Sequence, residues 1–91
     1  MSISKTQIDR CVSLAREYGA KKVILFGSAL ENPEKANDID LACDGIEGWQ
    51  LFEFGAQLEE LLLVPVDLVP LSPVTRFTRY VEKKGRVIYE S

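Results

Sequence analysis

Apolar residues recur at helical spacing in three parts of this chain, and each part has recognisable end signals. Ser4 and Gln7 fit the two ends of a capping box, which predicts a first helix that ends at Gly19. The spacing of leucines and phenylalanines predicts a second helix over residues 49–64, which Pro65 ends. A third helix is expected between residues 72 and 85.

The third helix is predicted from its ends. Ser72 and Pro73 make a good N-cap and first helical residue, and Gly85 is expected to stop the helix. Its spacing predicts that it buries Phe77, Tyr80 and Val81. Phe52 and Phe54 of the second helix are likewise expected in the core rather than in a base-stacking surface. Trp49, beside a glycine at a helix start, is a candidate for an exposed residue in a partner or self-association surface.

Short runs of β-forming residues alternate with these helices. They predict four strands, at residues 23–26, 37–43, 66–69 and 86–89. The order α-β-β-α-β-α-β predicts an α+β fold in which a mixed sheet of about four strands packs against about three helices. Residues 29–36 read as a polar loop or a short helical turn, so the first two strands are expected to pair antiparallel. One domain over residues 1–91 accounts for the whole chain.

Composition narrows the functions that such a domain can have. The net charge of −3 disfavours a role as a binder of polyanions, unless a local basic patch is present. The chain lacks an apolar run long enough to span a membrane and lacks the apolar core of a signal peptide, so a cytoplasmic location is expected. Its two cysteines lie among apolar neighbours and are expected to be buried and free. Histidine is absent, which excludes histidine bases and histidine metal ligands.

Three aspartates are the candidate chemistry. Side chains alternate across a strand, so Asp38 and Asp40 should share one face while Ile39 and Leu41 point into the core. Asp67 lies in a later strand with similar apolar flanks. If the two strands are neighbours, the three carboxylates converge and suit a site for two divalent cations, such as Mg²⁺, that clamps a phosphoryl transfer. The alternative is that Asp38 and Asp40 form the solvated face of a half-buried strand.

Gly27 and Ser28 follow a buried strand directly. A glycine there lets backbone N–H groups approach an anion, and the serine hydroxyl adds a donor, although both residues are also common in ordinary turns. The two Asp-containing motifs and the Gly-Ser motif are more specific together than separately. FGS, then NDIDLA, then VDLV resembles the minimal nucleotidyltransferases of the DNA polymerase beta superfamily, over nearly the whole chain.

The resemblance implies a nucleotidyltransferase-like fold and a role for each residue. Asp38 and Asp40 would hold two Mg²⁺ ions, and Asp67 would complete the site and help to activate the acceptor hydroxyl. Gly27 and Ser28 would hold the triphosphate of the incoming nucleotide. The implied reaction transfers AMP from ATP, or a nucleoside monophosphate from another NTP, to a hydroxyl and releases pyrophosphate. Such transfer depends on positioning and charge neutralisation more than on a strong base.

Minimal nucleotidyltransferases of this kind are typically antitoxins paired with a HEPN-domain ribonuclease toxin. The resemblance therefore implies a protein adenylyltransferase that transfers AMP to a tyrosine of its cognate toxin. This chain departs from the usual G-S-x-A-R-G-like loop, because Leu30, Glu31 and Asn32 stand in place of A-R-G and Lys35 is the nearest cation. Asn37 also replaces a common serine. The alternative is a catalytically weak or inactive binding module that neutralises its partner by contact.

Basic residues concentrate near the C-terminus of the chain. They are Arg76, Arg79, Lys83, Lys84 and Arg86. The first three share one face of the third predicted helix. A solvated helix face is the simplest interpretation, since cations also favour a helix C-terminus. Contact with an acidic partner or a nucleotide phosphate is the alternative, ahead of direct nucleic-acid binding.

Overall fold

The computed structural model describes residues 4–32 and 34–91, so residue 33 of the predicted loop and residues 1–3 lie outside the described residues. The elements follow in the order α1 (Lys5–Glu17), β1 (Lys22–Phe26), α2 (Ser28–Glu31), β2 (Ile39–Asp44), α3 (Trp49–Leu62), β3 (Val66–Pro70), α4 (Arg76–Lys84) and β4 (Arg86–Glu90). The α+β fold is confirmed. Its additional helix, α2, falls where the sequence predicts a loop or a short helical turn.

The four strands form one mixed sheet in the order β3-β2-β1-β4. Strand β1 lies antiparallel to β2, as expected for two strands joined by a short connection, and it also lies antiparallel to β4. Strand β3 lies parallel to β2, and α3 makes the crossover between them. Strands β2 and β3, which carry Asp40 and Asp67, are therefore neighbours.

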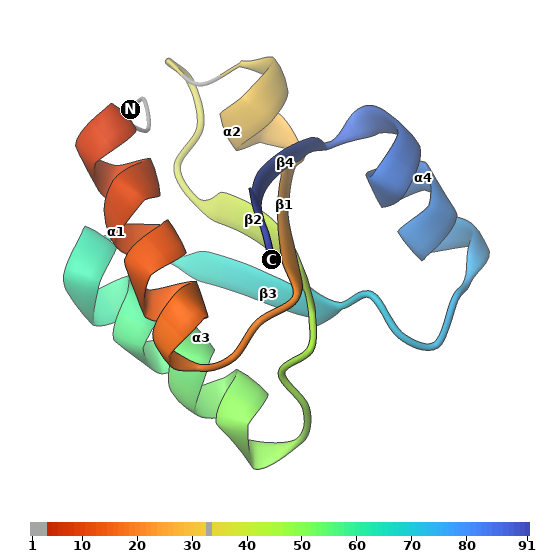
Figure 1. The fold of residues 1–91 in the computed structure, drawn as a ribbon. Coiled ribbons are helices and arrows are strands. Elements are labelled where there is room, and N and C mark those ends of the chain that lie inside the picture. The colour runs from red at the N-terminus through yellow and green to blue at the C-terminus, as the bar shows by residue number, and fades with distance from the viewer. Residues whose placement is uncertain (1–3, 33) are drawn as a thin grey trace.

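Helices cover both faces of this sheet, and Figure 1 shows α1 and α3 on one side and α4 on the other. Val23 and Leu25 point to the α1/α3 side, where the larger part of the core lies. Ile24 points to the other side and packs with Val81 of α4. Both cysteines are free and buried as expected, and burial raises the pKa of the Cys11 and Cys43 thiols to about 11.

At the helix starts, the local sequence pattern predicted the cap of α1 correctly and that of α4 wrongly. At the start of α1, the Gln7 N–H donates to Ser4 Oγ (3.1 Å) and the Ser4 N–H donates to Gln7 Oε1 (2.8 Å), which confirms the capping box. The predicted start of the third helix at Ser72 and Pro73 is wrong. Thr75 is the N-cap of α4, because its hydroxyl and that of Thr78 each accept a hydrogen bond from the other's N–H, at 3.1 and 2.7 Å.

The aromatic residues are less buried than the sequence predicts. Phe54 is fully buried, but Phe52, Phe77 and Tyr80 are 75%, 49% and 53% exposed, so the expectation that they lie in the core is wrong. Helix α4 buries Thr78 and Val81, and Val81 packs in the smaller of the two clusters of buried residues. Trp49 is exposed, as expected. In the described part of the chain, no helix is both long and apolar enough to cross a membrane.

Candidate active site

The candidate carboxylates lie at one end of strands β2 and β3. Ile39 and Leu41 are buried in the α1/α3 core, so Asp40 between them lies on the opposite face of the sheet. The parallel register pairs Asp40 with Asp67 of β3 directly. Asp38 precedes β2 by one residue and is exposed. The prediction that the two strands are neighbours is therefore confirmed, and the register places Asp40 and Asp67 side by side.

The surroundings of Asp40 change the pKa of its carboxyl group. It is partly buried, and its pKa is raised above 3.8, first by desolvation and then by the negative charges of Asp38 and Asp67. The negative charges of Asp38 and Asp67 therefore disfavour ionisation of Asp40. Within residues 4–32 and 34–91, however, no three acidic or cysteine side chains are grouped as a ready set of metal ligands. The three aspartates are neighbours, but by themselves they do not form a complete set of metal ligands.

Gly27 contacts this carboxylate directly. Phe26 is the cross-strand partner of Asp40, so Gly27 lies just past that pair, with φ 75° and ψ −154°. Such a backbone conformation is essentially restricted to glycine. A β-carbon at position 27 would collide with Oδ2 of Asp40. The glycine therefore leaves the space that the carboxylate occupies, a role that the sequence interpretation, which considered anion binding and an ordinary turn, missed.

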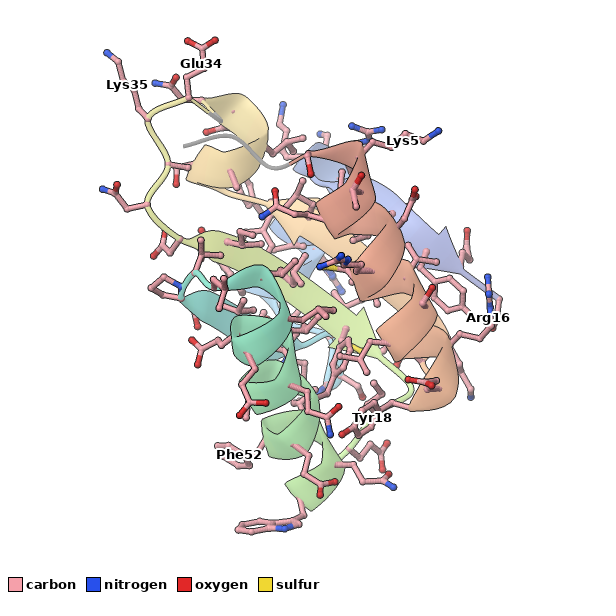
Figure 2. All side chains as sticks on the ribbon, turned by 90° about the vertical axis from the view of Figure 1, so that its left-hand side faces the viewer. Lys5, Arg16, Tyr18, Glu34, Lys35 and Phe52 are labelled. Carbon is pink, nitrogen blue, oxygen red and sulfur yellow. The ribbon has the colours of Figure 1, made fainter. Side chains whose placement is uncertain are left out.

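Ser28 begins the short helix α2 and is exposed beside this end of the sheet. The residues that replace the usual A-R-G all fall in this segment, because Leu30 and Glu31 belong to α2 and Asn32 is its C-cap. Figure 2 shows Lys35 at the outer end of the connection between α2 and β2, pointing away from the sheet. The nearest cation in sequence is therefore directed into solvent rather than toward the aspartates.

A groove between α3 and β3 borders the third aspartate. Its volume is about 510 Å³, and its lining includes Leu51, Phe52, Gly55 and Leu68 together with Asp67. At one end, Glu59 Oε2 accepts a hydrogen bond of 2.8 Å from the Val66 N–H. Sequence reasoning did not identify this groove. Its available signal was Gly55, a glycine in the interior of a predicted helix.

The donor set suits a hard divalent cation. Asp38, Asp40 and Asp67 offer only carboxylate oxygens, which Mg²⁺ prefers, and the buried cysteine thiols lie on the other face of the sheet. Desolvation and the negative charges of Asp38 and Asp67 raise the pKa of Asp40, and a bound cation would offset the effect of those charges. The residues present therefore fit a magnesium site.

A family model described as "Polymerase beta, Nucleotidyltransferase" matches residues 9–91. No match was found among curated proteins. Three solved structures show the same fold. The first, a toxin–antitoxin complex with AMP-PNP, has a chain with a TM-score of 0.78 and 22% identity, with 92% of this chain and 73% of that chain covered.

The second structure is the toxin–antitoxin MntA–HepT, with a TM-score of 0.75, 19% identity, and coverage of 97% and 74%. The third is a tri-AMPylated HEPN toxin of Shewanella oneidensis in complex with an MNT antitoxin, with a TM-score of 0.76, 20% identity, and coverage of 98% and 74%. These likenesses bear on the fold, and the family model spans most of the sequence. The chain therefore belongs to the polymerase beta nucleotidyltransferase family.

Proposed function

We propose that this chain is a magnesium-dependent nucleotidyltransferase that transfers AMP from ATP to a tyrosine hydroxyl of a HEPN-domain toxin in the cytoplasm and thereby acts as its antitoxin. The observation that carries the proposal is the pairing of Asp40 with Asp67 across parallel strands, with Gly27 against the Asp40 carboxylate. The family supports nucleotidyl transfer. The toxin–antitoxin complexes of the same fold, one with an AMPylated HEPN toxin, support the choice of acceptor.

Each site residue has a distinct task in this proposal. Asp38, Asp40 and Asp67 would hold magnesium, which when bound neutralises the charge of the triphosphate and of the leaving pyrophosphate. Gly27 and Ser28 would approach the phosphates through a backbone N–H and a hydroxyl. The acceptor oxygen forms a bond to the α-phosphorus as the bond from that phosphorus to the bridging oxygen breaks, and pyrophosphate leaves. Asp67 receives the acceptor proton and passes it to water.

Transfer of labelled AMP tests this proposal. The chain, copurified with a HEPN partner, is incubated with magnesium and ATP labelled in its α-phosphate, and label on the partner is measured. Asp38→Ala/Asp40→Ala should abolish labelling, because the metal ligands are lost. Asp9→Ala is the matched control, since Asp9 is an exposed carboxylate of α1, remote in sequence from the site. Labelling that persists in the double variant would contradict the assigned roles.

A second candidate function is neutralisation by contact alone. It is favoured by α2, where Glu31 adds a negative charge close to Ser28 and no cation occurs within the helix. Negative charge disfavours a bound triphosphate. The same experiment separates the two candidates. If the wild type transfers no label and the double aspartate variant still neutralises the toxin, contact is the function.

A further inference from the structure

The Asp40 and Asp67 carboxylates lie on the face of the sheet that α4 covers. Ala42 and Val69 pack in the cluster of residues that contains Val81 of α4. Asp40 and Asp67 each precede one of these residues by two positions in the same strand, so their side chains point the same way. Figure 1 shows α4 on this side of the sheet, opposite α1 and α3. A substrate bound at the two carboxylates therefore meets α4 rather than α1 or α3.

An aromatic pair adjoins Asp40 on this face. Phe26 is the cross-strand partner of Asp40, and it packs against the same cluster as Ala42. The ring of Phe77, from α4, meets the ring of Phe26 edge to face, with centroids 5.7 Å apart and 76° between the planes. Phe77 nevertheless remains 49% exposed. Because an edge-to-face contact covers at most one face of this ring, a flat group can stack on the open part.

The ion pair of Lys22 shows how α4 is turned relative to the sheet. Lys22 Nζ lies 3.0 Å from Oε1 of Glu82. Lys22 and Phe26 are the first and last residues of β1. Glu82 therefore lies toward the start of β1, whereas Phe77, which contacts Phe26, lies toward the end of β1 where the candidate site is.

Tyr80 and Lys84 lie on the same flank of α4 as Phe77. They follow it by three and seven residues, which places the three side chains in one row along the helix. Tyr80 and Lys84 are both exposed. A β-carbon at Gly85, directly after Lys84, would collide with Ile24, so this end of the row also lies close to β1. We call Phe77, Tyr80 and Lys84 the α4 row.

The α4 row offers the groups that a nucleotide requires besides metal ligands. An exposed aromatic ring can stack with a nucleobase, since every base has a flat π face. In the part of the chain that the structure describes, the ion pairs are those of Lys22, so the charge of Lys84 is available to a phosphate. Helix α2, which begins at Ser28, carries no lysine or arginine, and Figure 2 shows Lys35 pointing away from the sheet. The row therefore supplies an aromatic surface and a cation that the Gly-Ser segment does not.

We propose that the α4 row binds the nucleotide: a purine base stacks on Phe77 beside Tyr80, and Lys84 contacts the triphosphate. This inference rests on the proposed function and adds the residues that hold the nucleoside part of the substrate. Phe77 and Lys84 bind the substrate and take no part in the bonds that form and break. Because a purine has a larger flat surface than a pyrimidine, ATP should bind more tightly than CTP.

Isothermal titration calorimetry with magnesium tests the row, using ATP, CTP and inorganic tripolyphosphate, which has no base. Phe77→Leu keeps an apolar side chain against Phe26 but removes the ring. It should weaken binding of ATP by about tenfold and leave binding of tripolyphosphate unchanged. Phe77→Trp should bind ATP at least as tightly as the wild type. In NMR spectra, the adenine protons of ATP should shift upfield on binding to the wild type, and much less on binding to Phe77→Leu.

Two matched controls lie outside the row. Phe52→Leu makes the same change on α3, from which Figure 2 shows Phe52 projecting on the far side of the sheet, and it should bind ATP as the wild type does. Lys84→Met should weaken binding of ATP and of tripolyphosphate by the same factor, about three- to fivefold. Lys83→Met should change neither, because Lys83 lines a separate groove with Arg79 and Glu82 on the other flank of α4.

The proposal is overturned if Phe77→Leu binds ATP as tightly as the wild type does. Equal affinities of the wild type for ATP and tripolyphosphate, or no binding of either, also overturn it. If Phe77→Leu binds ATP normally but no longer associates with a HEPN partner, the row is a protein contact instead.

Transfer of labelled AMP to the copurified partner separates failure of the row from failure of the proposed function. If ATP stacks on Phe77 as described but AMP is never transferred, the proposed function fails while the nucleotide site stands. If Phe77→Leu transfers AMP with an unchanged KM for ATP, the nucleotide site fails while the proposed function stands.

Discussion

Replacing Gly27 with alanine should damage both the stability and the active site of this protein. At φ 75° and ψ −154°, an alanine is strained by about 1–3 kcal/mol. For a domain of this size, that strain lowers the melting temperature by roughly 5–20 °C. The new methyl group would also overlap Oδ2 of Asp40, so the carboxylate has to move away from its position beside Asp67. Loss of stability and loss of metal-dependent function should therefore occur together.

Gly19→Ala separates these two effects. Gly19 also has a positive φ, of 79°, but a β-carbon there meets no atom within 4 Å, and the residue follows α1, outside the candidate site. It should cost about 1–2 kcal/mol through backbone strain alone. Thermal unfolding followed by circular dichroism, with and without magnesium and ATP, measures both properties. The wild type and Gly19→Ala should be stabilised by magnesium and ATP, and Gly27→Ala should not.

Two results would refute this reasoning. If Gly27→Ala melts with the wild type and responds equally to magnesium and ATP, then neither the strain nor the contact with Asp40 exists. If Gly19→Ala loses the response as completely as Gly27→Ala, the loss reflects general destabilisation rather than displacement of a ligand.

Three further predictions concern charge and packing. Desolvation and two neighbouring carboxylates raise the pKa of Asp40, so folding favours its protonated form, and the contribution of Asp40 to stability falls as the pH rises from 3.8 through its raised pKa. Metal-free Asp40→Asn should therefore melt higher than the wild type at neutral pH, and a lower melting temperature would contradict this. Phe54→Ala should lower the free energy of unfolding, measured by chemical denaturation, by about 3–5 kcal/mol. Phe52→Ala, at a residue 75% exposed, should leave it nearly unchanged, and equal losses in the two variants would be inconsistent with the packing described. Lys22→Met breaks the 3.0 Å ion pair with Glu82, which is partly exposed, and should cost no more than about 1 kcal/mol by the same measurement; a loss of several kcal/mol would show that the pair is more strongly coupled.

The sequence alone predicted those features that depend on residues only a few positions apart. The capping box of Ser4 and Gln7 forms because the bonding groups are three residues apart. The alternation of Asp40 with Ile39 and Leu41 follows from the geometry of any strand. These features predicted most of the elements and the face on which Asp40 lies. The predicted start of the third helix failed because Thr75 and Thr78 form a reciprocal cap from a pair that the usual Ser/Thr-to-Glu/Gln pattern does not include.

Tertiary structure decided what depends on neighbours distant in the sequence. The sequence named Asp67 as a candidate, but only the parallel register of β2 and β3 pairs it with Asp40. Phe77 and Tyr80 follow a helical period, yet α4 buries Thr78 and Val81 against the rest of the protein and leaves the two rings half exposed. The contact of Gly27 with the Asp40 carboxylate, and the groove beside Gly55, arise from segments brought together by folding. Periodicity along a chain defines the direction of a side chain, whereas the shape and charge of a site depend on which other elements meet it.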